Sequence, residues 1–236
     1  MILSRLIDLT QEIYNGMPVY PGHQRTAIFQ VKTHEETKLQ YKTEHTSTTL
    51  GILFCDHGPT HVDAINHIDS RPDAPSIDQL PLELFYTKAI CLDVSSVKPD
   101  QYMTVEVLKD ALTRSGLTIK PNSAVLCYTG HYNRNYLNPE KWLYEYPGLD
   151  RGAMLFLADQ GVINVGIDAP SIDAAIELKL KHYPAHRVCR ERQMVNTENL
   201  ANLDKVAGRE FIFSCLPLPI RGGTGSPIRA VAIFED

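Results

Sequence analysis

The sequence lacks three features that would each have indicated its class directly: a C-x-x-C pair, a run of lysines and arginines, and an apolar stretch of membrane-spanning length. Its five cysteines are odd in number, lie far apart and mostly stand in apolar runs such as ILFC and FIFSC: Cys55, Cys91, Cys127, Cys189 and Cys215. Because this pattern does not suggest a disulfide framework, we interpret the cysteines as buried thiols in a reducing cytosol.

Positive charge is also scarce. The chain has 23 basic and 28 acidic residues, a formal net charge of −5 with neutral histidines. Without a positive field or a basic run it is not expected to bind nucleic acid or a membrane, and a small-molecule substrate is the expected partner. Arg5 and Asp8 interrupt the first apolar residues too early for a signal peptide, so we expect a cytoplasmic protein.

The composition is that of a folded protein. Hydrophobic residues make up 43% and charged residues 22%, which is enough to bury a core that holds a rigid site. A length of 236 residues fits one large domain or two small ones, and we take residues 1–236 as a single domain.

The first quarter of the chain is rich in strand signals. Leu6–Ile13 predicts a short strand, followed by a Gly/Pro turn over Asn15–His23. The segments TAIFQVKTH and TSTTLGILF, separated by the polar EETKLQYKTEH, predict an antiparallel pair of strands.

Strand and helix patterns then alternate. KAICLDVS, SAVLCYTG and VINVGID predict strands, and a helix is expected over 104–116, ending at Gly116 with Leu108, Ala111 and Leu112 on one face. A loop is expected over 131–148, a helix over GAMLFLADQG, and another helix opening at its cap Ser171. This order predicts a mixed α/β domain.

The segment DHGPTHVDAINH, Asp56 to His67, places three histidines and two aspartates within twelve residues. These side chains are ligands of zinc, manganese or iron. Pro59 opposes a helix here, whereas an extended THVD would send His61 and Asp63 to one face, with Gly58–Pro59 turning His57 toward them. Three ligands from one short segment leave coordination positions open, as a catalytic metal site requires.

His67 follows Asp63 by four residues, close enough to stand beside a metal ion without entering its first shell. An imidazole titrates near working pH, so we predict that His67 acts as general base and acid. The alternative, that these polar residues only cap or solvate a turn, is disfavoured by their density.

The segment DHGPTHVDAINH resembles the H-x-G-T-H-x-D-x-P-x-H signature of the cyclase family of metal-dependent hydrolases, which includes bacterial kynurenine formamidase and isatin hydrolase. The resemblance extends from DLTQEIYNGMPVYPG through YPGLDRGAMLFLADQGVINVGIDAPSID to HRVCRERQMVNTENLANL and LPLPIRGGTGSPIRAVAI. It implies a swivelling β/β/α fold with a mixed sheet, and a homodimer or higher homo-oligomer.

The resemblance also implies residue roles. His57, His61 and Asp63 would bind a first metal ion, with His67 as the proton-transfer residue. The pair His186 and Glu198 would either complete a second metal site bridged by Asp63 or hold water or substrate. One or two ions of zinc or manganese are both compatible, because each metal accepts nitrogen and oxygen donors.

Three positions depart from the family pattern: Pro59 replaces a glycine, Ile65 replaces a proline, and His131 stands where many relatives have tryptophan. We therefore expect a different substrate pocket and leave the substrate open. His131 either lines that pocket or is a solvated loop residue.

Other polar residues are weaker candidates. Arg187, Arg190 and Arg192 could hold a substrate carboxylate, but a solvated helix face is the favoured interpretation. His182 is left out of the site because Pro184 separates it from His186. Residues 222–227 predict a tight turn before the last strand.

The expected function is that of a metal-dependent hydrolase which opens an amide, formamide, or cyclic amide or lactone bond of a small, aromatic substrate through a metal-activated water. One alternative is a non-haem iron oxygenase using His61, Asp63 and His186, although such enzymes favour jelly rolls over alternating strands and helices. A non-catalytic metal-binding module is the other alternative.

Overall fold

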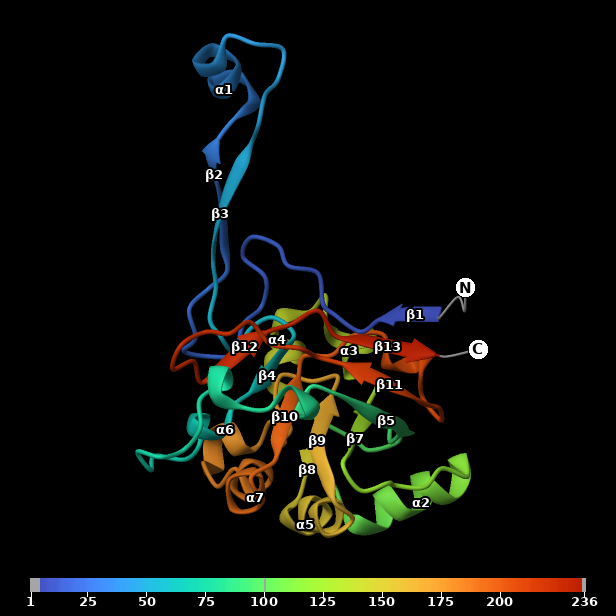
Figure 1. Ribbon diagram of the computed structural model, residues 1–236. Coiled ribbons are helices and arrows are strands. Elements are labelled where there is room, and N and C mark those ends of the chain that lie inside the picture. The colour runs from blue at the N-terminus through green and yellow to red at the C-terminus, as the bar shows by residue number, and fades with distance from the viewer. Residues whose placement is uncertain (1–4, 100, 235–236) are drawn as a thin grey trace.

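The computed structural model describes residues 5–99 and 101–234 (Figure 1). Its strands are β1 (Arg5–Asp8), β2 (Ala27–Lys32), β3 (Thr49–Leu53), β4 (His61–Asp63), β5 (Tyr86–Asp93), β6 (Tyr102–Met103), β7 (Ser123–Tyr128), β8 (Gly148–Leu149), β9 (Val162–Ile167), β10 (Val195–Glu198), β11 (Glu210–Ser214), β12 (Gly225–Pro227) and β13 (Val231–Phe234). Its helices are α1 (His34–Tyr41), α2 (Val105–Ser115), α3 (His131–Asn135), α4 (Pro139–Tyr144), α5 (Arg151–Asp159), α6 (Glu177–Leu180) and α7 (Pro184–Arg192).

A nine-stranded sheet with the order β1-β13-β11-β5-β7-β9-β10-β4-β12 forms the centre of the molecule. Strands β5, β7, β9 and β10 are parallel neighbours, and antiparallel strands extend the sheet on both sides. Parallel neighbours need crossover connections, which helices α2, α5 and α7 supply along one side of the sheet in Figure 1. The predicted mixed α/β fold is confirmed.

Alternating side chains of the parallel strands face two apolar clusters. Ile90 and Leu92 of β5 point to the cluster that includes α2, α5 and α7, whereas Ala89 and Cys91 point to the opposite one. Helix α2 buries Leu108 and Ala111 as predicted and ends at Gly116, whose φ of 68° suits a glycine. All five cysteines are free thiols, and four of them are buried.

Strands β2 and β3 form the predicted antiparallel pair, which projects from the sheet as an arm (residues 27–53) with α1 at its far end (Figure 1). The polar linker folds as α1 because Thr33 and Glu36 form a capping box. Apolar side chains stay exposed on both faces of the arm, with exposed fractions of 55% for Phe29 and 56% for Ile52.

Three predicted elements differ from the structure. The expected loop 131–148 contains α3 and α4. The helix predicted to open at Ser171 is absent from this part of the described chain: the Ser171 hydroxyl accepts from the Asp173 backbone in a local turn, and α6 begins only at Glu177. Residues 222–227 include strand β12 as well as a turn. No helix among the described residues is long and apolar enough to span a membrane.

Candidate active site

Strand β4 forms the floor of the site. It is extended through His61 and Asp63, as Pro59 predicted, and both side chains are buried. The preceding turn brings His57 back over the strand, so that its Nδ1 lies 2.7 Å from Asp63 Oδ1. Nε2 of His61 lies 3.3 Å from the same oxygen. The structure therefore brings the three side chains of this short segment together.

The neighbouring strand and helix add the remaining pair. Antiparallel register places Glu198 of β10 beside His61 of β4, with Glu198 Oε2 3.5 Å from His61 Nε2. Helix α7 contributes His186, whose Nε2 lies 3.3 Å from Asp63 Oδ2 and 3.5 Å from Glu198 Oε1. Asp63 thus faces the first group with one oxygen and His186 with the other.

Each of these three histidines has its second ring nitrogen bound to a fixed acceptor. Thr224 donates to Asp56 Oδ2, so its hydroxyl accepts from His57 Nε2 at 2.8 Å. The carbonyl of Pro59 accepts from His61 Nδ1 at 2.9 Å.

His186 is held in the same way. Its Nδ1 donates to the Asp173 carboxylate at 2.5 Å. In all three histidines the remaining nitrogen faces Asp63 or Glu198, where it donates to these carboxylates when protonated and would offer its lone pair to a cation when that proton is released.

This donor set fits a divalent cation. Nitrogen and oxygen ligands at about 2.0–2.2 Å from a tetrahedral ion stand roughly 3.3–3.5 Å from one another. Four of the contacts above fall at 3.3 or 3.5 Å. Two overlapping triads have ligand atoms within 4.8 Å of one another: His57, Asp63 and His67, and His61, Asp63 and Glu198.

The electrostatics agree with this fit. Burial alone would lower the pKa of His61, but hydrogen bonds to Asp63 and Glu198 raise it to about 10. Burial opposes ionisation of Asp63 as well, yet the surrounding imidazoles keep its pKa well below the usual range. Asp63 therefore stays ionised and attracts positive charge, which is what a cation-binding site requires.

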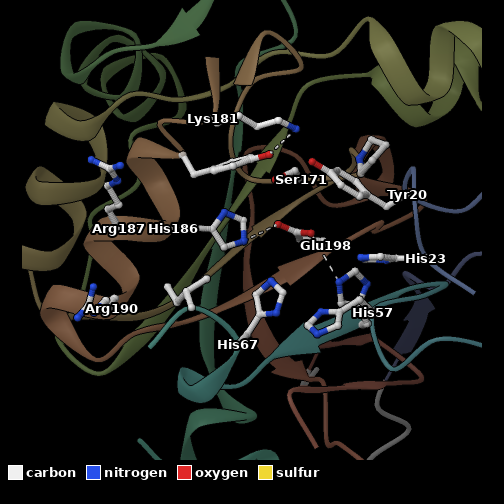
Figure 2. A pocket seen from close by; sticks show the side chains of 14 residues that line it. Tyr20, His23, His57, His67, Ser171, Lys181, His186, Arg187, Arg190 and Glu198 are labelled. Carbon is white, nitrogen blue, oxygen red and sulfur yellow. Dashed lines mark hydrogen bonds and ion pairs between the residues drawn. The ribbon is translucent and has the colours of Figure 1, made fainter. Parts of the chain in front are cut away.

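His67 lies in the turn that follows β4 and lines the same pocket. Its ring centroid is 4.0 Å from that of His57 and 5.9 Å from that of His186 (Figure 2). Burial lowers its pKa to about 4, which favours a neutral imidazole able to accept a proton. His67 thus lies at the cluster, with its ligand atom within 4.8 Å of those of His57 and Asp63.

The pocket is a cavity of about 410 Å³. Besides Glu198 and the four histidines described above, the lining residues are Tyr20, His23, Ile68, Pro170, Ser171, Lys181, Tyr183, Arg187 and Arg190. Arg187 and Arg190 are exposed, as expected for a solvated helix face, and both also line this cavity. Arg192 instead pairs with Asp159 at 3.0 Å. His182 is not among the lining residues, as expected.

His131 is neither a pocket residue nor a solvated one. It is fully buried, with its ring stacked on Trp142 at 4.8 Å. Its Nε2 donates to the Trp142 carbonyl, and Asn135 donates to its Nδ1. Burial lowers its pKa to about 4, so this neutral histidine ties α3 to α4.

Several supporting residues were not predicted. Asn196 donates to Asp63 Oδ2 at 2.8 Å and to Glu198 Oε1 at 3.2 Å, which fixes both carboxylates. Thr224 directly precedes β12, the strand next to β4, and Asp173 precedes α7. No local motif marks these residues, because sheet order and register bring them to the site.

The chain is similar to known proteins along nearly its whole length. Residues 7–174 match the family described as putative cyclase. Kynurenine formamidase from Salinibacter ruber is 30% identical over 96% of each chain, and that from Geobacillus thermodenitrificans is 28% identical over 97% of each.

Solved structures share the fold. Isatin hydrolase A from Ralstonia solanacearum superimposes with a TM-score of 0.85 at 25% identity, covering 98% of this chain and 92% of that one. Isatin hydrolase A from Labrenzia aggregata gives 0.85 at 24% identity, over 99% and 94% of the two chains. Because the family model spans more than half of the sequence and a 30% identical relative matches nearly all of it, the chain belongs to the cyclase family.

Proposed function

We propose that this protein is a metal-dependent hydrolase that opens a formamide, amide or cyclic amide bond of a small aromatic substrate. The observation that carries the proposal is the set of three histidines, each with one nitrogen fixed by an acceptor and the other facing Asp63 or Glu198. The family membership supports it, since the relatives are named for hydrolysing a formamide or isatin.

In this proposal His57, His61 and Asp63 hold a first zinc or manganese ion, and His186 with Glu198 holds a second one or orients water and substrate. A bound divalent cation lowers the pKa of a coordinated water and polarises a carbonyl oxygen. Asn196 keeps both carboxylates in place through its amide group.

His67 performs the proton transfer in this proposal. As a neutral imidazole it accepts a proton from the attacking water and returns it to the departing nitrogen. Tyr20 and Tyr183, which both line the cavity, offer flat faces against which an aromatic ring can pack.

The test is hydrolysis of N-formylkynurenine and of isatin by the purified protein, before and after chelation and after restoration with zinc or manganese. Activity should disappear with the chelator, return with metal and be independent of oxygen. The variant His67→Ala should lose about 100-fold or more in kcat, because general acid–base catalysis contributes on that order. His182→Ala is the matched control; hydrolysis unaffected by chelation would refute the proposal.

We also propose that the chain forms a homodimer or a higher homo-oligomer. The arm supports this proposal because apolar side chains are exposed on both of its faces, including Phe29, Val31, Leu50 and Ile52. A two-stranded ribbon is marginally stable in water by itself, so a second copy that covers the arm would stabilise it.

A further inference from the structure

Three cationic side chains line the cavity, and together they are called the cationic wall below: Lys181, Arg187 and Arg190. In Figure 2 both arginines project from α7, on the same side of the cavity as His186. Lys181 instead reaches over Tyr183 toward Ser171, so positive side chains border the cavity at two places around His186.

The charges of this wall are not neutralised by the chain itself. Among the described residues, no carboxylate lies within ion-pair distance of Lys181 or Arg187. Arg190 lies 3.5 Å from Asp69, but Arg71 already binds both oxygens of that carboxylate. The wall thus has positive charge in excess, although the whole chain has a net charge of −5.

The backbone around Lys181 is conformationally strained. Lys181 and Tyr183 both adopt left-handed conformations, with φ of 59° and 46°, which non-glycine residues rarely do. The buried carboxylate of Glu177 holds this segment by accepting from the backbone amides of His182 and Tyr183 at 2.8 and 3.2 Å. Lys181 Nζ lies 3.4 Å from the hydroxyl of Tyr183, so the ammonium stands beside the phenol group.

We infer that the cationic wall binds the carboxylate of an aromatic substrate and so makes the pocket selective for acids over uncharged analogues. Arginine forks match the planar carboxylate, and Tyr183 supplies an aromatic face next to Lys181. The inference rests on the proposed function for the bond that is cleaved.

The kinetic test uses the metal-loaded protein and a matched substrate pair, ortho-formamidobenzoate and its carboxamide, which differ only in the charged group. The ratio of kcat/KM for the acid to that for the carboxamide should fall roughly tenfold in Arg187→Gln, through KM, and further in the double variant with Arg190→Gln. Arg192→Gln is the control, because Arg192 lies on the same helix, pairs with Asp159 and does not line the cavity. An equal fall in the control would overturn the inference.

A binding measurement separates this inference from the proposed function. Calorimetric titration of the metal-loaded wild type should show tighter binding of ortho-aminobenzoate than of its carboxamide, and Arg187→Gln should remove most of that preference. If this holds while no formamide is hydrolysed, the proposed reaction is wrong and the acid-binding wall stands. Equal binding of the two probes by the wild type, or a preference unchanged by Arg187→Gln, would show that the wall does not bind the carboxylate. Either result would contradict the inference.

Discussion

At the scale of single residues, the nitrogen of each site histidine that faces away from the cluster is as informative as the one that faces it. Thr224, the Pro59 carbonyl and Asp173 fix the orientation and tautomer of His57, His61 and His186. Such partners raise the basicity of a ligand and hold its ring in position. Asp173 has a further role, because it accepts from the first backbone amides of α7.

Asp173→Asn should therefore weaken metal binding about tenfold to 100-fold, since an amide is a poorer acceptor for His186 Nδ1. The measurement is competition of zinc or manganese between the protein and a chromogenic chelator. Asp159→Asn, which removes an exposed carboxylate, is the control. Unchanged affinity in Asp173→Asn would show that Asp173 does not support His186.

Asp168 gives a pH-dependent contribution to stability. Burial raises its pKa to about 6 from 3.8, although Thr129 donates to its Oδ1 from both backbone and hydroxyl. The folded state therefore binds the proton more tightly than the unfolded state does. The contribution of Asp168 to the free energy of unfolding is therefore fully present below pH 3.8. It is lost as the pH rises through about 6.

Asp168→Asn cannot ionise, so its stability relative to the wild type should increase between about pH 4 and pH 7. The gain is on the order of 2–3 kcal/mol. Urea unfolding of both proteins at several pH values, under the same metal conditions, measures it. A stability difference between the two proteins that stays constant across this pH range would contradict the raised pKa of Asp168.

At the scale of elements, short signals predicted more than composition did. Strand β4 followed from Pro59 and the THVD pattern, and α2 followed from its apolar face and Gly116. Helix α1 was missed although Thr33 and Glu36 have capping-box spacing, because its residues show no apolar periodicity. The helix start at Ser171 was wrong because the same Ser-x-Asp pattern also forms a closed turn.

The arm is the element on which the proposed homodimer can be tested. Phe29 and Ile52 lie on opposite faces of the β2–β3 pair, since their cross-strand partners are Gly51 and Ile28. Replacing both by serine should convert the dimer to a monomer, as measured by light scattering after size-exclusion chromatography. Leu137→Ser, which changes a 92% exposed leucine outside the arm, should leave the mass unchanged. A monomeric wild type would contradict the proposal.

At the scale of the whole molecule, the site depends on contacts that the sequence order hides. The local motif predicted the part of the site between His57 and His67. The family resemblance predicted His186 and Glu198. The cationic wall was not predicted, because a sequence cannot tell that the exposed side chains of Arg187 and Arg190 also border a cavity. Asn196 and Thr224 could not be found at all, since only the order β10-β4-β12 brings them beside Asp63 and His57.

The central claim is that His57, His61, Asp63, His186 and Glu198 form a divalent metal site. Mass spectrometry of metals bound to the purified wild type and to His61→Ala, with His182→Ala as control, tests it most directly. We predict one or two zinc or manganese ions per chain in the wild type and the control, and loss of bound metal in His61→Ala. Full metal occupancy in His61→Ala would contradict the account.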